Sequence, residues 1–358
     1  MNPILDLTDI AQKIGGLFIG GMPGPELDDQ TTILIKDYHL GGIILFHRNI
    51  RDPVQLAQLC QDLQMVSMEN TGIPLFLAID QEGGRVARLG EPFTQFPGNA
   101  AIGENPDPEK SALHFATTTA REMSLVGLNM NMAPVLDVAQ PNMDAHLVGR
   151  PFSHEPLQVI ALGKIVINTL QQGGIMAVAK HFPGLGKSDL DPHQHLPTVS
   201  ATSEEMESIH LPPFAGAIEA HVSAIMSSHA VYPALDPGIP ATLSRRIMTD
   251  LLRESMRFDG LIISDDLEMG AIVNERGMPG GAADALEAGV DLLLICKNQS
   301  HLLTSIELIR DKVLKEEIPY ERLERSIARI AKYKKRFLYP HKKISLKAVK
   351  EFFGNTDT

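Results

Sequence analysis

The sequence predicts a closed (β/α)₈ barrel of the TIM type that forms a single domain. Eight short aliphatic runs, bounded by glycine, proline or polar residues, have the length and composition of buried strands. Stretches whose apolar residues recur with helical spacing separate these runs. Strands buried on both faces read as continuous apolar runs, and their alternation with helices indicates a parallel sheet. Eight such units in succession favour closure into a barrel.

The strand candidates are spaced so that a helix fits between neighbouring runs. In chain order they are 16–20, 42–46, 75–79, 130–137, 175–179, 224–228, 260–264 and 291–295. Residues 159–170 carry an apolar stripe with helical spacing, as do Val54, Leu56, Leu59, Leu63 and Val66. The alternation of strand and helix therefore continues along the chain.

The C-terminal part of the chain is strongly helical from about residue 300, and we interpret 325–336 as the last barrel helix. Four basic residues are expected to form a solvated face near the end of this helix, where they complement its dipole: Lys332, Lys334, Lys335 and Arg336. A binding patch is the less favoured interpretation. We expect 1–340 to form the barrel and 341–358 to be a C-terminal extension that is partly helical.

A doubly wound open sheet is the alternative architecture. Such a sheet typically carries Gly-x-Gly-x-x-Gly after its first strand, where the glycines allow a dinucleotide to approach the backbone. No such motif follows the first strand here, and the chain has no internal repeat or low-complexity linker. These observations favour one barrel domain.

The composition limits the kinds of partner. The chain has 358 residues, of which 44% are hydrophobic, so it can bury a sizeable core. Its 32 basic and 44 acidic residues give a formal net charge of -12. Nucleic acids and anionic membranes attract basic surfaces, so neither is expected as the main partner. A small, neutral or locally steered substrate fits this charge better.

The cysteines and the N-terminus indicate an intracellular protein. Cys60 and Cys296 lie within apolar patterns, where inert core thiols are the expected state. The first residues lack the basic start and apolar core of an export signal. No segment reaches the roughly 20 apolar residues needed to cross a membrane. We therefore expect a cytoplasmic protein without membrane insertion, and we expect it to be a monomer.

Polar side chains follow five consecutive predicted strands. Because the active sites of barrels lie at the C-terminal ends of the strands, these side chains are expected to meet at one mouth. From the third to the seventh strand they are Asp80 with Arg88, Asp137 with Arg150, Lys180 with His181, Ser228 with His229, and Asp265. The five strands therefore predict one shared site.

Several of these residues have structural alternatives. Asp80 and Asp137 could cap a following helix or bind an arginine. His229 is more often a packing histidine, and we do not include it in the site. Lys180 directly follows an aliphatic strand, so its ammonium group must lie near a carboxylate or a substrate. We therefore favour a functional role for Lys180.

The segment Asp191-Pro192-His193 has the features of an acid/base pair. Residues two apart in an extended segment point the same way, so the carboxylate can bind one imidazole nitrogen while the other faces a substrate. The proline stiffens the pair, and Gly184 and Gly186 could let the loop move. A surface loop rich in turn-forming residues is the structural alternative.

Two carboxylates follow the seventh strand. Asp265 comes after three aliphatic residues and has no basic sequence neighbour. An ionised carboxylate at a barrel mouth can attack an electrophilic carbon. Asp266 points to the opposite side if the strand continues, so we expect it to be structural.

Four motifs at these positions resemble the family 3 glycoside hydrolases, specifically the single-domain bacterial β-N-acetylhexosaminidases of the NagZ type. They occur in the family's order and cover the chain from about residue 10 to 335. The motifs are Ile-Asp-Gln-Glu-Gly-Gly-Arg-Val at 79–86, Met-Ala-Pro-Val-Leu-Asp-Val at 132–138, Lys-His-Phe-Pro-Gly at 180–184 with Asp191-x-His193, and Ser-Asp-Asp-Leu-x-Met at 264–269.

The resemblance implies a role for each site residue. Asp265 would be the nucleophile, His193 the general acid and base, and Asp191 the partner of His193. Five residues match positions that hold the hydroxyl groups of the sugar in relatives: Asp80, Arg88, Arg150, Lys180 and His181. The implied reaction is a double displacement with retained configuration, and it requires no metal or organic cofactor.

The resemblance also implies a substrate, a terminal β-linked N-acetylglucosamine, with muropeptides of cell-wall recycling as the natural source. The chain departs from the family pattern at Leu185, Lys187 and Ser188, where His, Asp and Thr are frequent, so the motion of the loop and its leaving-group contacts are in question. A β-glucosidase or a glycoside phosphorylase is the alternative within the family. A metal-dependent hydrolase and a non-catalytic sugar-binding barrel are more remote alternatives.

Overall fold

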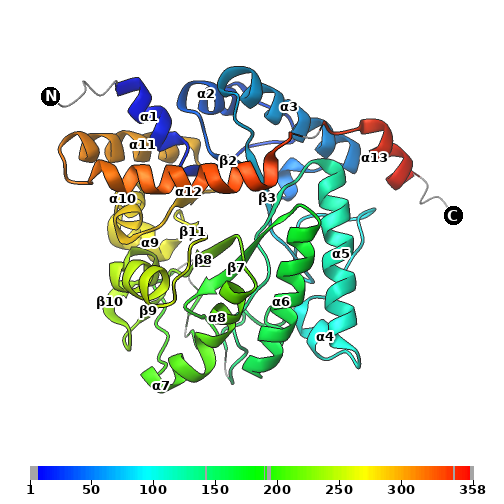
Figure 1. Cartoon of the computed structure of the whole chain (residues 1–358), viewed down its shortest axis with the longest axis vertical. Coiled ribbons are helices and arrows are strands. Elements are labelled where there is room, and N and C mark those ends of the chain that lie inside the picture. The colour runs from blue at the N-terminus through cyan, green and yellow to red at the C-terminus, as the bar shows by residue number, and fades with distance from the viewer. Residues whose placement is uncertain (1–6, 142, 189, 192–194, 342, 355–358) are drawn as a thin grey trace.

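The computed structural model describes residues 7–141, 143–188, 190–191, 195–341 and 343–354. Its central feature is a closed barrel of parallel strands in the order β1-β12-β11-β8-β7-β6-β3-β2, surrounded by helices (Figure 1). The predicted (β/α)₈ fold is confirmed. The barrel closes where β1 (Phe18–Gly21) pairs with β12 (Leu292–Ile295) on one side and with β2 (Gly42–Leu45) on the other.

Each of the eight predicted runs overlaps a barrel strand. The other five are β3 (Phe76–Ile79), β6 (Met130–Asn131), β7 (Met176–Phe182), β8 (Ala224–Ser227) and β11 (Leu261–Asp266). β6 is much shorter than the predicted run, because Pro134 has no N–H group for the ladder. Its carbonyl oxygen still accepts from Lys180 N at 3.1 Å, so the chain continues beside β7.

Two hairpins extend from the C-terminal ends of strands. β4 (Gln81–Gly83) and β5 (Val86–Ala87) follow β3, and β9 (Val231–Tyr232) and β10 (Asp236–Pro240) follow β8. Gly83 and Gly84 turn the first hairpin with φ of +87° and +61°, a region that favours glycine.

Helices fill the connections between strands. The longer ones are α2 (Asp29–Tyr38), α3 (Pro53–Thr71), α5 (Pro108–Val126), α6 (Pro156–Gln172), the π-helix η4 (Arg246–Ser255), α10 (Met278–Ala288) and α11 (Gln299–Leu314). The shorter ones are α1 (Leu7–Gly15), α4 (Asn99–Gly103), α7 (Ser203–Glu205), the π-helix η2 (Met206–His210), α8 (Pro212–Glu219) and α9 (Gly270–Arg276). The two predicted apolar stripes lie on α3 and α6 and supply buried residues to the core.

α12 (Tyr320–Leu338) crosses the N-terminal end of the barrel, as Figure 1 shows. Arg322 donates to the carbonyl oxygens of Leu286 and Val290, and Arg329 binds Asp291, the residue before β12. We had interpreted this segment as the last barrel helix. Instead α11 completes the outer layer, since it follows β12 and packs against α10 and β1. The position of α12 could not be predicted from the sequence, because it depends on contacts between residues that are far apart in the chain.

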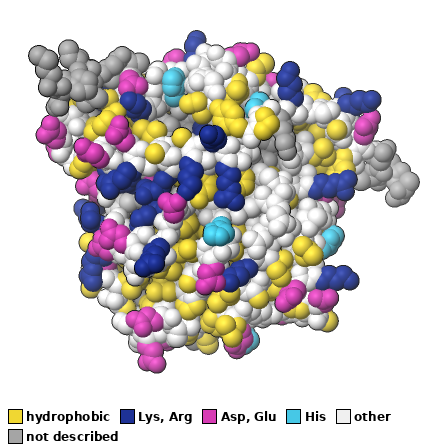
Figure 2. Space-filling model, viewed as in Figure 1, with side chains coloured by type: hydrophobic (Ala, Val, Ile, Leu, Met, Phe, Trp, Pro, Cys, Tyr) yellow, Lys and Arg dark blue, Asp and Glu magenta, His cyan; other side chains and the backbone are white. Residues whose placement is uncertain are grey.

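Lys334 is buried, so the prediction that it forms part of a solvated face of α12 is wrong. Its side chain stands between Ile330 and Leu338 at helical spacing, on the face that packs inward. Only 6% of the residue is exposed, and the ammonium group lies 5.1 Å from the ring centre of Phe76. The other three residues, Lys332, Lys335 and Arg336, are exposed, and Figure 2 shows basic side chains gathered over α12.

The C-terminal extension contains α13 (Leu346–Phe353), which packs against α3 and α5. The Phe353 ring lies 4.6 Å from that of Phe93, centre to centre. The boundary at residue 340 stays a prediction. Both cysteines are free and buried. No helix in the described ranges is long and apolar enough to cross a membrane.

We predict that Lys334→Met stabilises the protein near neutral pH. Burial lowers the pKa of Lys334 from 10.5 to about 7. The unfolded chain therefore holds this proton more tightly, so the cost to stability is complete below about pH 7 and disappears toward pH 10.5. At about 1.4 kcal/mol per pKa unit, the gain is on the order of 3 to 5 kcal/mol at pH 6.5.

Chemical denaturation at pH 6.5 and pH 9.5 measures this gain, which should shrink at the higher pH. Lys332→Met is the matched control on the exposed face of the same helix, where its ammonium group pairs with Asp259 at 2.6 Å. The control should change the free energy of unfolding by less than about 1 kcal/mol. A loss of stability in Lys334→Met at pH 6.5 would contradict the interpretation.

Candidate active site

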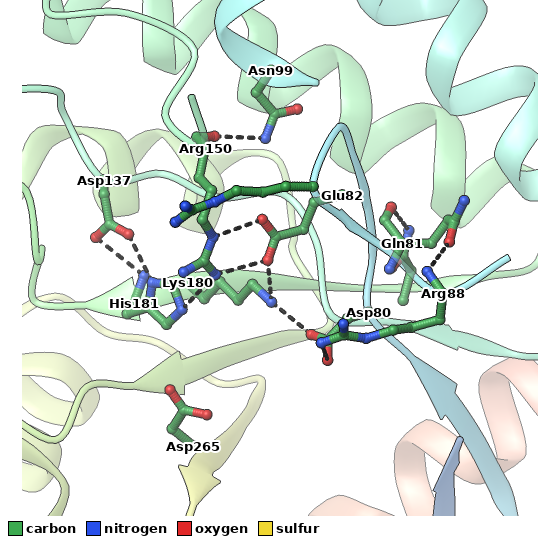
Figure 3. Close-up of polar contacts among 12 residues, drawn as sticks. Asp80, Gln81, Glu82, Arg88, Asn99, Asp137, Arg150, Lys180, His181 and Asp265 are labelled. Atoms are coloured by element: carbon green, nitrogen blue, oxygen red, sulfur yellow. Dashed lines mark hydrogen bonds and ion pairs between the residues drawn. The ribbon is translucent and has the colours of Figure 1, made fainter. Parts of the chain in front are cut away.

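Six of the eight predicted site residues lie together at the C-terminal end of the barrel (Figure 3). Asp80 directly follows β3, Lys180 and His181 lie on β7, and Asp265 lies on β11. Arg88 follows the first hairpin, and Arg150 lies in the loop between β6 and α6. Side chains from strands far apart in the sequence thus face one another, as the strand-end rule predicts.

Lys180 binds two carboxylates. Its Nζ lies 2.8 Å from Asp80 Oδ1 and 2.7 Å from Glu82 Oε1, and only 3% of its side chain is exposed. Burial alone would lower the pKa of Lys180, but Asp80 and Glu82 more than offset it and the pKa is raised. We expected the ammonium group of Lys180 to lie near a carboxylate or a substrate, and it lies near two carboxylates.

Asp80 also lies beside Arg88, whose Nη2 is 3.5 Å from Asp80 Oδ2. Burial alone would raise the pKa of Asp80, but the attraction of Lys180 and Arg88 lowers it to about 2. Gln81 Oε1 fixes the Arg88 backbone by accepting from its N–H at 2.9 Å. The Nε of Arg88 is buried without a hydrogen-bond partner in the described ranges, so it is a donor available to a ligand.

Arg150 and His181 belong to the same network. Arg150 donates to both oxygens of Glu82, at 3.0 and 2.8 Å, and its Nη2 lies 3.3 Å from His181 Nε2. Because arginine can only donate, His181 Nε2 accepts, and its Nδ1 carries the hydrogen donated to Asp137 Oδ2 at 2.7 Å. His181 is therefore held on both sides.

Glu82 and Asp137 are functional candidates that the site prediction omitted. Glu82 bridges Lys180 and Arg150, and its side chain is 1% exposed. Asp137 was weighed as a helix cap or an arginine partner, whereas its carboxylate accepts from the ring and backbone of His181 and from Leu185 N. The signal for Glu82 was its spacing of two from Asp80, which places both side chains on one face of an extended segment.

Asp265 faces this network from β11 (Figure 3). Its Oδ1 accepts from the backbone N–H of Asp266 at 2.8 Å. Burial alone would raise the pKa of Asp265, but the surrounding positive charge, which includes Lys180, and the hydrogen bond from the Asp266 N–H more than offset it. The net shift is downward, so the carboxylate is ionised at neutral pH and can act as a nucleophile.

Asp266 has the structural contacts expected from the sequence. Its Oδ1 accepts from Glu268 N at 3.1 Å and from Cys296 N at 3.2 Å, which ties the end of β11 to the end of β12. Burial raises its pKa to about 6. Neither hydrogen-bond partner of Asp266 belongs to the network around Lys180.

The predicted pair Asp191 and His193 is only partly within the described residues. Pro192 and His193 lie outside them, while the carbonyl oxygen of Asp191 accepts from His195 N at 3.2 Å. The start of this loop is held by Lys187, whose Nζ lies 2.7 and 2.9 Å from the two carboxylate oxygens of Glu205. The pairing of Asp191 with His193 stays a prediction.

The residues where the chain departs from the family pattern fit their surroundings. Leu185 is buried and donates its N–H to Asp137 Oδ1 at 2.7 Å, and Ser188 pairs with Val199 across the base of the loop. A Cβ at Gly186 would lie 1.9 Å from the Val138 carbonyl oxygen. Close packing therefore requires a glycine at position 186. Its presence does not indicate that the loop moves.

The described residues contain no group of three or more His, Cys, Asp or Glu side chains arranged to hold a metal ion. Their clustered polar groups instead form an alternating set of carboxylates and cations. Such a surface offers fixed hydrogen-bond donors and acceptors to a ligand rich in hydroxyl groups.

Comparisons with known proteins agree with this geometry. The sequence profile of the glycosyl hydrolase family 3 N-terminal domain matches residues 9–333. A β-hexosaminidase of Pseudomonas aeruginosa is 36% identical over 277 residues, which are 77% of this chain and 81% of that protein. β-Hexosaminidase A of Pseudoalteromonas piscicida is 34% identical over 92% of this chain, but the match spans only 58% of that longer protein.

Solved structures show the same relationship. The family 3 β-N-acetylglucosaminidase of Paenibacillus sp. str. FPU-7 superposes with a TM-score of 0.89 at 35% identity, covering 96% of this chain and 67% of that one. A β-N-acetylhexosaminidase of Beutenbergia cavernae gives a TM-score of 0.84 at 28% identity and covers 93% and 99%. The chain therefore belongs to glycosyl hydrolase family 3 and is a glycoside hydrolase.

Proposed function

We propose that this protein is an exo-acting, retaining β-N-acetylglucosaminidase. The observation that carries the proposal is the Asp265 carboxylate, which faces the buried charged network around Lys180 at the barrel mouth (Figure 3). The β-hexosaminidase names of the relatives and of the similar structures support the choice of sugar.

In the proposed complex the network binds the hydroxyl groups of the terminal sugar. Lys180 and Arg88 supply donors, and Asp80 accepts. Arg150 and His181 complete the surface, and their pairing with Glu82 and Asp137 orients them before the sugar arrives. A preorganised surface of this kind holds the anomeric carbon at a fixed position relative to Asp265.

The proposed mechanism is a double displacement. An oxygen of Asp265 attacks the anomeric carbon and forms an ester bond while the bond to the leaving-group oxygen breaks. His193 gives its proton to that oxygen, and Asp191 stabilises the protonated ring. His193 then removes a proton from water, which attacks the anomeric carbon and releases Asp265. The sugar leaves with retained configuration.

The finer points of the proposal concern the biological setting. Terminal β-linked N-acetylglucosamine on muropeptides is the proposed natural substrate. The cytoplasmic location and the monomeric state stay predictions.

A panel of nitrophenyl β-glycosides tests the reaction class and the sugar. We expect kcat/KM for the β-N-acetylglucosaminide to exceed that for the β-glucoside by at least about 10²-fold, because the difference reflects contacts to one substituent. Added phosphate should leave the rate and the product, free N-acetylglucosamine, unchanged. A preference for glucose would favour a β-glucosidase, and a sugar phosphate product would favour a phosphorylase.

Asp265→Ala should lower kcat by on the order of 10⁴-fold, because the variant has no group to form the covalent intermediate. A 2-deoxy-2-fluoro glycoside should label Asp265, and peptide mass spectrometry identifies the site. Asp266→Asn is the matched control, since its Oδ1 can still accept from Glu268 N and Cys296 N. Labelling at Asp266 would overturn the assignment of the nucleophile.

His193→Ala should slow substrates with poor leaving groups by about 10²-fold to 10⁴-fold, because these need the proton that His193 supplies. Formation of the intermediate from a dinitrophenyl glycoside, whose leaving group departs without a proton, should change far less. Pre-steady-state release of the phenolate measures this step. Equal losses on both substrates would argue against His193 as the general acid.

A further inference from the structure

His229 is a buried titratable residue that the proposed mechanism does not use. It follows the end of β8 and is 1% exposed. Its Nδ1 lies 2.7 Å from Thr242 Oγ1, and its Nε2 lies 3.1 Å from the carbonyl oxygen of Asp266. The titratable groups near the ring are the Asp265 carboxylate and His181. We had interpreted His229 as a packing residue. Its ring nevertheless contacts the backbone next to the candidate nucleophile, Asp265.

The hydrogen-bond partners of His229 fix its tautomer. A carbonyl oxygen only accepts, so Nε2 must carry a hydrogen and donate it to Asp266. Burial lowers the pKa of His229, which favours a neutral ring. A neutral ring has one hydrogen, so Nδ1 accepts from the Thr242 hydroxyl group.

The surrounding hydroxyl groups can support this tautomer. Ser227 Oγ lies 2.7 Å from Thr242 Oγ1 and can donate to it. Thr242 Oγ1 also lies 2.9 Å from the Ser228 carbonyl oxygen, which accepts from the Thr242 N–H at 3.2 Å. The hydroxyl group has one hydrogen, and because a neutral His229 ring leaves Nδ1 as an acceptor, we assign this hydrogen to His229. Ser227 then donates to Thr242, Thr242 donates to His229, and His229 donates to the carbonyl oxygen of Asp266.

The contact with Asp266 replaces a missing part of the strand ladder. β11 pairs with β8 only from Leu261 to Ile263, and its register against β12 shifts between Ile263 and Asp266. The ladder with β8 therefore ends before Asp265. Beyond that point, His229 Nε2 binds the Asp266 carbonyl oxygen from the β8 side, and Cys296 N binds the Asp266 side chain at Oδ1 from the β12 side.

The residue that is fixed in this way contacts Asp265: His229 binds the carbonyl oxygen of Asp266, and the N–H of the same residue faces the Asp265 carboxylate. The N–H of Asp266 donates to Asp265 Oδ1 at 2.8 Å, so a rotation of Asp266 would move the carboxylate. We propose that His229 is a positioning residue for the nucleophile: its Nε2–H fixes the Asp266 backbone, and this backbone orients the Asp265 carboxylate. The proposal rests on the proposed function through the role given to Asp265.

Two variants of His229 separate positioning from packing. His229→Leu removes the donor and keeps an apolar side chain of similar reach, whereas His229→Gln keeps an N–H donor in place of Nε2. The rate of phenolate release from dinitrophenyl β-N-acetylglucosaminide reports attack by Asp265. We expect this rate to fall by about 10²-fold in His229→Leu and by less than about 10-fold in His229→Gln, since small misplacements of a nucleophile are costly.

The controls distinguish this result from a loss of folding or of sugar binding. The inhibition constant of N-acetylglucosamine should change by less than about 3-fold in both variants, because the sugar contacts lie on other strands. Wild-type rates in His229→Leu, or equal losses in the two variants, would overturn the proposal. A wild-type protein that cleaves no β-glycoside would instead overturn the proposed function.

Measurements on the unmodified chain keep the proposal testable if His229→Leu does not fold. Nitrogen NMR of ¹⁵N-histidine-labelled protein between pH 6 and 8 should show a neutral His229 with its hydrogen on Nε2. An imidazolium, or a hydrogen on Nδ1 alone, would overturn the assignment. Thr242→Val removes the hydroxyl group that orients the ring, so the same phenolate release should slow by about 3-fold to 10-fold, and an unchanged rate would count against the proposal.

Discussion

The site depends on the pairing of charges around Lys180. An isolated ammonium group in a buried position costs several kcal/mol, and this cost is offset only if carboxylates and hydrogen bonds compensate it. Asp80 and Glu82 provide that compensation, and Glu82 in turn binds Arg150. Two strands, β4 and β7, and two connecting segments thus share one set of charges. Because buried ion pairs often add little net stability, we infer that the main effect of the arrangement is to orient the polar groups.

The same constraint explains why the site lies at the C-terminal end of the strands. β7 continues to Phe182 and β11 to Asp266, beyond the predicted runs, so both strands carry polar residues within the sheet. Side chains attached to strands are held more firmly than side chains on loops. Lys180 and Asp265 are therefore both held in place by strands of the sheet.

The sequence was sufficient to predict the barrel, because buried parallel strands leave continuous apolar runs. It also predicted that Asp80, Lys180, His181 and Asp265 meet, since the strand-end rule needs only strand boundaries. The burial of Lys334 was not predicted, because its basic neighbours indicated an exposed face whereas Lys334 itself lies on the inner face of α12. Glu82 and His229 were missed because their roles depend on partners that are distant in the sequence.

Closure of the barrel has a consequence for how this chain folds. β1 pairs with β12, so the first and last strands are neighbours in the sheet although they lie near opposite ends of the chain. During synthesis the edge of β1 must stay unpaired until β12 has left the ribosome, and an open strand edge is prone to associate with other chains. The site at the mouth, which combines groups from β3, β7 and β11, can therefore reach its final geometry only after nearly all of the chain has been made.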